Sequence, residues 1–122
     1  GKAAELIDLR SHQGVHPRVG AADVIPFVPL DGSDLAECAA VAHRAGAEIH
    51  EKWSIPVFFY EAAARTPERR RLEKVRRKGF EQLLSDVELH IPDVGGARVH
   101  PTAGASCVGA RDFLIAFNID LE

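Results

Sequence analysis

The chain has 122 residues, a length typical of one domain with a hydrophobic core of its own. Hydrophobic residues make up 46% and charged residues 27%, which is ordinary globular usage and excludes a disordered chain. A formal charge of -3 argues against a protein whose main role is to coat nucleic acid. The lack of a long apolar run excludes a membrane-spanning helix.

The first ten residues predict the latter part of an amphipathic helix, with Leu6, Ile7 and Leu9 toward one side. Gly14 and Pro17 are expected to end this helix. No capping residue stands before its start, so we expect the chain to be a fragment of something longer.

A strand, a long helix and a second strand are expected next. Residues 24–30 are rich in β formers, but Pro26 and Pro29 lack a backbone N–H and favour an edge position or an interrupted strand. Ser33 is expected to cap the long helix. The apolar residues of this helix recur at spacings of three and four: Leu35, Cys38, Ala42, Ala45, Ile49 and Trp53. Residues 57–60 are a short continuous apolar run and predict a buried strand.

Basic side chains gather between residues 65 and 78. They are Arg65, Arg69, Arg70, Arg71, Lys74, Arg76, Arg77 and Lys78. Pro67 fits a first helical position, and Gly79 fits the end of a helix. The run could bind phosphate or carboxylate groups. Because it lacks interleaved aromatic residues, a solvated helix face with Glu68 and Glu73 as local partners is the preferred interpretation.

The last third of the chain predicts a helical turn, a loop and a hairpin. Residues 80–84 predict the turn, and residues 91–104, rich in Gly and Pro, predict the loop. Ala105–Val108 and Phe113–Ile119 flank a turn-like segment and predict a β-hairpin. The order of these elements predicts an α/β fold, an α+β sandwich in which helices pack on a mixed β-sheet.

The two cysteines, Cys38 and Cys107, are too few for a disulfide framework and lack the spacing of zinc ligands. We predict that both are small buried residues of a protein kept in a reducing compartment.

The segment from His12 to Arg18 is the most polar one beside an expected strand. An imidazole exchanges a proton near neutral pH, which makes His16 a candidate general acid or base. Arg18 could hold an anionic group, and Asp23 could orient a neighbour. From spacing alone a structural interpretation is preferred, in which His16 caps a turn and Arg18 pairs with a surface carboxylate.

A metal site is a weaker alternative for the same segment. Asp8, His12 and His16 are spaced by four residues and would share one face of a continuous helix. Gly14 and Pro17 argue against such a helix.

Three stretches, read together, resemble a known family. Residues 6–27 contain His-Pro-Arg-Val-Gly-Ala-Ala-Asp, residues 56–63 read Pro-Val-Phe-Phe-Tyr-Glu-Ala-Ala, and residues 104–121 contain Gly-Ala-Arg and Ala-Phe-Asn. In this order they resemble the N-terminal subdomain of glutamate formimidoyltransferase, the formiminotransferase part of formiminotransferase-cyclodeaminase and its bacterial relatives. The resemblance covers nearly the whole chain.

The resemblance implies a fold and a domain. Residues 1–122 would be the formiminotransferase N-terminal subdomain, an α/β sandwich with a mixed sheet, without the family's first strand and its Asn-Phe-Ser-Glu-Gly segment. The family's C-terminal subdomain has no counterpart here either. We therefore expect a truncated fragment with little or no activity alone.

The resemblance also implies a reaction, the transfer of a formimino group from N-formimino-L-glutamate to tetrahydrofolate in histidine degradation and one-carbon metabolism. His16 falls on the family's catalytic histidine and would be the general acid/base, and Arg18 is our candidate for binding a substrate. The family's folate-contacting loop falls on Gly95, Gly96, Ala97, Arg98, Val99, His100, Pro101, Thr102, Ala103 and Gly104. Gly104 is expected to let the backbone approach a flat ligand. The loop departs from a common form of the family at Val94 and Gly96.

Tetrahydrofolate would be a co-substrate, and no metal is expected. We expect a cytoplasmic protein that works with a C-terminal formiminotransferase subdomain, as a homodimer, and binds neither nucleic acid nor membrane. His12, nearer the helix end, is expected to cap terminal carbonyls. The alternatives are a non-catalytic relative that binds folate or a partner protein, and a nucleic-acid-binding domain that uses the basic segment.

Overall fold

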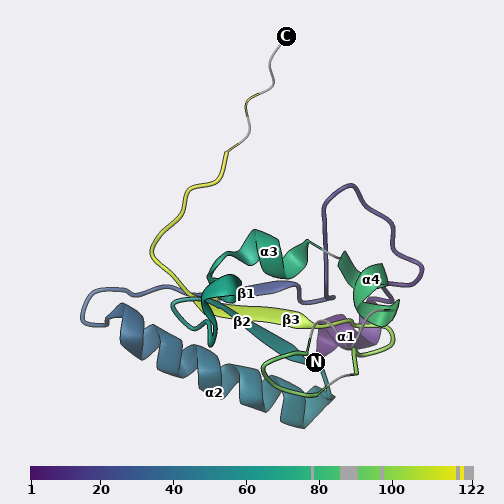
Figure 1. The fold of residues 1–122 in the computed structure, drawn as a ribbon, viewed down its shortest axis with the longest axis horizontal. Helices are drawn as coiled ribbons and strands as arrows, with labels where there is room; N and C mark the ends of the chain where they lie inside the picture. The colour runs from purple at the N-terminus through teal and green to yellow at the C-terminus, as the bar shows by residue number, and fades with distance from the viewer. Residues whose placement is uncertain (78, 86–90, 97, 118, 120–122) are drawn as a thin grey trace.

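Three parallel strands form the central layer of the molecule. The computed structural model describes residues 1–77, 79–85, 91–96, 98–117 and 119. The strands are β1 (Val24–Phe27), β2 (Val57–Glu61) and β3 (Ser106–Ala110), and β3 lies between the other two (Figure 1).

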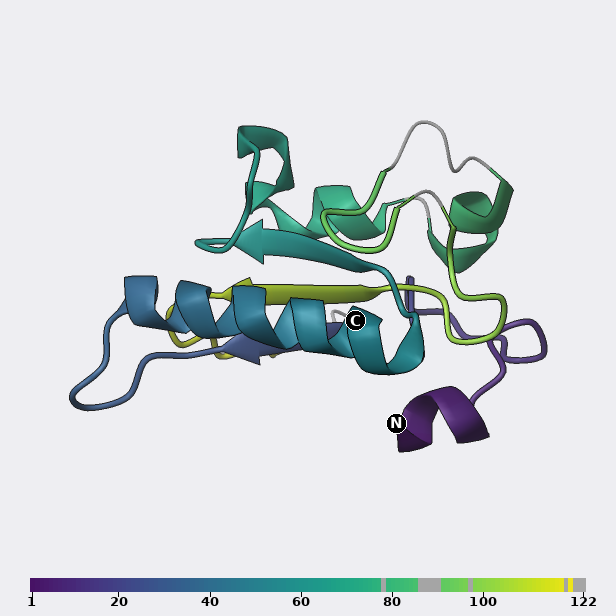
Figure 2. The same cartoon turned by 90° about the horizontal axis from the view of Figure 1, so that it is seen from below.

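Helices cover both faces of this sheet. Helix α2 (Leu35–Trp53) lies along one face, while η1 (Pro67–Arg70), α3 (Leu72–Arg76) and α4 (Gly79–Ser85) lie on the other side (Figure 2). This layering confirms the predicted α/β fold. None of the described helices is both long and apolar enough to cross a membrane.

The alternation of side chains along β2 explains the two layers. Val57 and Phe59 join the buried cluster under α2, whereas Phe58 and Tyr60 join the cluster under α3 and α4. A strand that is covered on both faces is apolar at every position, which is why the continuous run predicted it correctly. The predicted burial of both cysteines is confirmed as well.

Strand β1 lies at an edge of the sheet, as its prolines predicted. The carbonyl of Asp23 accepts a hydrogen bond from Cys107 of β3, and that of Phe27 accepts one from Arg111, the residue after β3. The backbone of Pro26, one position out of step with Phe27, therefore presents its nitrogen to the open side. A missing N–H costs nothing in that direction. The strand ends at Phe27, two residues before Pro29.

Helix α2 begins one residue later than predicted. Asp34, not Ser33, is its N-cap: Asp34 Oδ1 accepts a hydrogen bond from the Glu37 N–H at 2.8 Å, and Glu37 Oε2 accepts one from the Asp34 N–H at 3.0 Å. The Ser33 hydroxyl instead bonds the backbone of Leu30 and closes the preceding turn. A Cβ on Gly46 would lie 2.6 Å from the Phe59 ring, so glycine allows the close approach of α2 to the sheet.

The first helix is shorter than predicted. Helix α1 spans Lys2–Leu6, and Ile7 is already extended. The chain leaves the helix because the backbone of Leu9 donates a hydrogen bond to the carbonyl of Thr102 at 2.9 Å, which replaces a bond within the helix. The predicted end near Gly14 and Pro17 is therefore wrong.

The basic segment forms two short helical elements instead of one helix. Pro67 begins η1, as predicted, but Arg71 is extended and separates η1 from α3. Gly79, the first residue of α4, has a positive φ of 65°, and α3 ends before it at Arg76, which agrees with its predicted role as a helix stop. Lys78 lies outside the described residues.

The predicted hairpin is wrong. Strand β3 pairs with β1 on one side and β2 on the other, both in parallel, so neither edge is left for an antiparallel partner. Residues 111–117 contain no strand and lead away from the sheet (Figure 1), and Phe113 and Phe117 are exposed. Among the described strands the expected mixture of directions is therefore absent.

Candidate functional site

The His12–Asp23 segment and the loop before β3 meet at the end of the sheet where the parallel strands β1 and β3 begin. Because the strands are parallel, the residues that precede β1 and β3 come to the same end. Ala21 donates a hydrogen bond to the Ala103 carbonyl, and Ala105 donates one to the Val19 carbonyl, both at 2.9 Å. The structure thus brings together the bases of the two segments in which the candidate site residues lie.

Two glycines make this contact possible. A Cβ on Gly20 would lie 1.7 Å from the Ala105 carbonyl oxygen, and a Cβ on Gly104 would lie 2.1 Å from the Val19 carbonyl oxygen. Gly104 also has a positive φ of 71°. Close approach at Gly104 was expected for a ligand, but here it serves the chain's own packing, so its replacement would disturb the fold.

The loop itself is folded by its own backbone. His100 and Gly104 exchange two backbone hydrogen bonds, and His100 Nδ1 accepts one from the Ala103 N–H at 3.0 Å. Ala103 and Gly104 are buried, so they offer no side chain to a ligand. Of the predicted loop residues, the following are exposed: Gly96, Arg98 and Pro101. Ala97 lies outside the described residues.

Residues 7–23 lead from α1 to β1 and form an arch (Figure 1). His16 is exposed in this arch. Its Nδ1 lies 3.4 Å from the carbonyl oxygen of Pro17. A carbonyl oxygen only accepts, so this contact favours the tautomer with the proton on Nδ1 and leaves Nε2 as the basic nitrogen. The ring therefore presents a proton acceptor to the surroundings.

Arg18 ties the base of this arch together. Its Nη2 donates to the carbonyls of Leu9 and His12 at 3.2 and 2.6 Å and pairs with Glu81 of α4 at 2.9 Å. The expected pairing of Arg18 with a surface carboxylate is confirmed. The backbone N–H of Glu81 and, to a lesser degree, Arg18 hold the pKa of that carboxyl below its usual range.

The predicted role of His12 as a helix cap is wrong. Helix α1 ends at Leu6, well before His12, and Arg18 caps the His12 carbonyl instead. His12 lines a surface hollow between the arch and α4, together with Leu9, Arg18 and Phe80.

The early end of α1 also argues against the alternative of a metal site. Asp8, His12 and His16 all follow the end of α1, so no helix face holds them together. Asp8 instead pairs with Arg10 at 2.6 Å, and the hydrogen bonds from Arg10 lower the pKa of Asp8 to about 2. In the described ranges no three His, Cys, Asp or Glu side chains gather as a metal would require.

Asp23 and Arg76 form a link that the sequence pattern did not reveal. Asp23 Oδ1 accepts hydrogen bonds from the N–H groups of Val19 and Gly20 at 2.7 and 3.2 Å. Its other oxygen pairs with Arg76 of α3, which also donates to the Pro17 carbonyl. The only sequence signal was a basic run with more charges than Glu68 and Glu73 can pair.

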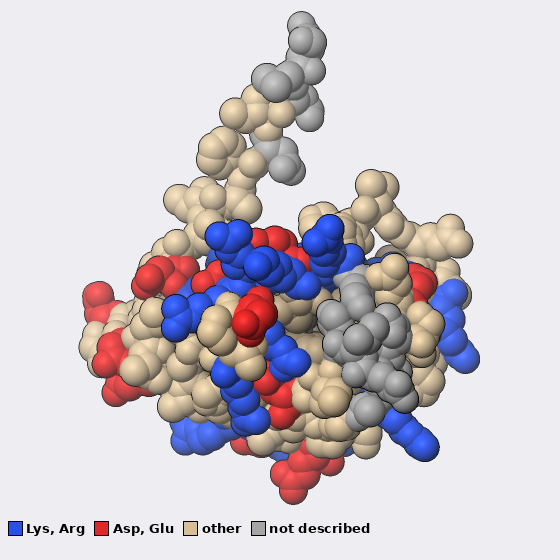
Figure 3. Space-filling view, in the orientation of Figure 1, with Lys and Arg blue, Asp and Glu red and all other residues tan. Residues whose placement is uncertain are grey.

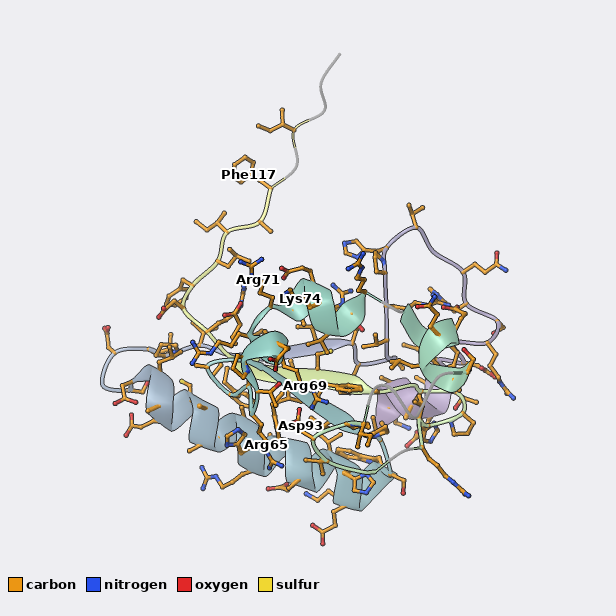
Figure 4. All side chains as sticks on the ribbon, in the orientation of Figure 1. Arg65, Arg69, Arg71, Lys74, Asp93 and Phe117 are labelled. Carbon is orange, nitrogen blue, oxygen red and sulfur yellow. The ribbon has the colours of Figure 1, made fainter. Side chains whose placement is uncertain are left out.

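The basic segment pairs elsewhere than predicted. Among the described residues, neither Glu68 nor Glu73 forms an ion pair; Arg69 pairs instead with Asp93 at 2.7 Å (Figure 4). Asp93 also accepts a hydrogen bond from the Phe59 N–H at 2.7 Å, which fastens the start of the loop to the outer edge of β2. Lys and Arg side chains, blue in Figure 3, gather on the surface over η1 and α3.

The comparisons with known proteins agree with the resemblance. Residues 1–111 match the family described as formiminotransferase domain, N-terminal subdomain. The chain is 43% identical to glutamate formimidoyltransferase of Streptococcus pyogenes serotype M1 and 48% identical to that of Thermoplasma acidophilum, over 98% of this chain and 41% of each relative. It is 43% identical to mouse formimidoyltransferase-cyclodeaminase, over 98% of this chain and 22% of that protein. The chain thus spans about two-fifths of the first two relatives, and it belongs to the formiminotransferase N-terminal subdomain family.

Proposed function

We propose that this chain supplies the N-terminal subdomain of a glutamate formimidoyltransferase, which transfers a formimino group from N-formimino-L-glutamate to tetrahydrofolate. The observation that carries the proposal is the family match over residues 1–111, which includes the whole His-Pro-Arg segment. Two relatives that are 43 and 48% identical bear the name of this transferase.

His16 is the proposed general acid/base. A nitrogen of tetrahydrofolate attacks the formimino carbon and forms a tetrahedral intermediate. His16 Nε2 takes the proton that the attacking nitrogen loses and returns it to the glutamate nitrogen, whose bond to carbon then breaks. One imidazole serves both steps because it is regenerated in its neutral form, and its exposed position leaves Nε2 open to the reactants.

Substrate binding is assigned to Arg18 and to the Gly95–Gly104 loop. Among the described residues of this loop Gly96, Arg98 and Pro101 are exposed, so a folate can reach them without disturbing the fold. The site is completed, in this proposal, by a C-terminal formiminotransferase subdomain within a cytoplasmic homodimer. The 122-residue chain alone is therefore expected to show little turnover.

The test is steady-state kinetics on a polypeptide that carries this chain at the full length of its relatives. His16→Ala is expected to lower kcat by roughly 10² to 10⁴, the usual loss for an acid–base group. His12→Ala is the matched control and should retain turnover, with circular dichroism confirming that both variants fold. Near-normal turnover in a folded His16→Ala variant would contradict the assignment.

A further inference from the structure

We infer that Arg76 is a positioning residue for His16, an inference that rests on the proposed function. Arg76 lies on α3, 59 residues after Pro17 in the chain, yet its Nη2 donates a hydrogen bond to the carbonyl of Pro17. The same carbonyl lies 3.4 Å from His16 Nδ1. The guanidinium and the imidazole thus meet at one oxygen atom.

Asp23 holds the guanidinium in this place. One carboxylate oxygen pairs with Arg76 Nη2, and the other accepts the N–H groups of Val19 and Gly20. Both members of the ion pair are largely enclosed, with 19% of the Arg76 side chain and 22% of the Asp23 side chain exposed. The side chains of Arg76 and Asp23 therefore connect the two ends of the segment from Pro17 to Asp23, and this connection fixes the shape of the segment.

Val75, the residue before Arg76, anchors this connected segment to the hydrophobic core. Val75 is buried in the cluster that contains Phe58 and Tyr60 of β2. Because Val75 is held by the sheet, the direction in which the next residue leaves α3 is set as well. The position of the Pro17 carbonyl is therefore fixed relative to the sheet, although His16 itself is exposed.

The consequence is a fixed acceptor for the Nδ1–H of His16. With the carbonyl immobile, the ring keeps one tautomer and one direction, and Nε2 points where the proton transfer needs it. Asp23 balances the charge of Arg76, so the arginine acts on the direction of the ring and not as a free positive charge beside it. Arg76 needs no contact with either substrate.

The experiment uses the full-length protein with Arg76→Gln, Arg76→Lys and, as matched control, Arg77→Gln at the adjacent exposed arginine. Arg76→Gln is expected to lower kcat by about 10- to 100-fold, the usual effect of losing a group that orients a reactive side chain. KM should change less than about threefold. Since a single nitrogen makes both contacts, the ammonium of Arg76→Lys should restore most of kcat. Arg77→Gln should match the parent protein.

Nitrogen NMR of the His16 ring separates this inference from the proposed function. Loss of the Nδ1–H tautomer in folded Arg76→Gln supports the positioning role even if the parent protein shows no transferase activity. An unchanged tautomer, or a rise in KM at constant kcat, overturns it. If Arg76→Gln does not fold, Asp23→Asn replaces it; an unchanged tautomer and kcat in that variant also overturn the inference.

Discussion

The two faces of the sheet are covered by different means. One face is covered mainly by α2, a helix of 19 residues whose small residues pack against Phe59 and Val108 of the strands. On the other face lie η1, α3 and α4, each a few residues long, and two arginine–aspartate pairs fasten the first two of them to the loops around the sheet.

This difference indicates that one face mainly stabilises the fold, whereas the other mainly fixes the direction of the chain segments attached to it. Apolar packing stabilises in proportion to buried area and has little preference for orientation, whereas a hydrogen-bonded ion pair fixes where a chain segment points. The arch that holds His16 is attached to the second face, through Arg76 of α3 and through the pair of Arg18 with Glu81 of α4. We expect variants on the α2 face to cost more stability and those on the opposite face to change geometry first.

The largest effect is expected for Phe59→Ala on the α2 side. Phe59 is fully buried, and its loss leaves a cavity beneath α2, which should lower the free energy of unfolding by about 3–5 kcal/mol. Urea unfolding followed by circular dichroism measures the change. Phe113→Ala, at a side chain that is 75% exposed, is the matched control and should change little. A similar loss in both variants would contradict the assigned core.

The next effect is expected for Asp93→Asn. This removes the charge that Arg69 pairs with while keeping the size of the side chain, and should cost about 2 kcal/mol, as for hydrogen bonds to charged groups. Glu48→Gln breaks the exposed pair with Lys52 and is the control, with no measurable change expected. Equal unfolding midpoints for the two variants would show that ion pairs do not fasten η1.

A smaller effect is expected at the start of α2. Asp34→Ala removes the side-chain half of the capping box and should cost about 1 kcal/mol. Ser33→Ala, at the residue that the sequence favoured as cap, should cost less, because its hydroxyl bonds only the exposed turn at Leu30. A larger loss for Ser33→Ala would restore the cap predicted from the sequence.

The smallest effect, none at all, is expected for alkylation of folded Cys107. Burial raises the pKa of this thiol to about 12, so it stays protonated at pH 8 and its rate of reaction with iodoacetamide should stay near zero from pH 7 to 9. A Cys38→Ala background isolates the signal, and the same protein in urea provides the reactive reference. Labelling that rises with pH in the folded protein would mean that the α3 side of the sheet opens readily.

The parts of the fold that the sequence revealed are those with local patterns. The apolar spacing of α2 and the continuous run of β2 are contained in neighbouring residues, so they could be predicted. The strand at β3 was also recognised, but its partners were not. Its turn-like flank indicated a hairpin, whereas its true neighbours are residues 24–27 and 57–61, far away along the chain.

The candidate site divides in the same way. His16 and Arg18 stand in a motif that is read directly, and their assigned roles in catalysis and binding stay predictions. The contacts that shape their surroundings join distant segments: Asp23 with Arg76 across 53 residues, and Gly20 with the start of β3. A single sequence carries no local signal for such pairs, because each residue alone is an ordinary surface charge or turn glycine.

The strand order has a consequence for how the chain is made. During synthesis β1 and β2 leave the ribosome before β3, yet among the described strands they are not neighbours, and β3 pairs with both. Until residues 106–110 emerge, both strands lack their β3 partner, and Phe58 and Tyr60 lack the packing that Cys107 provides. Because β3 pairs in the middle of the three described strands, the formation of this sheet depends on contacts between segments that lie far apart along the chain.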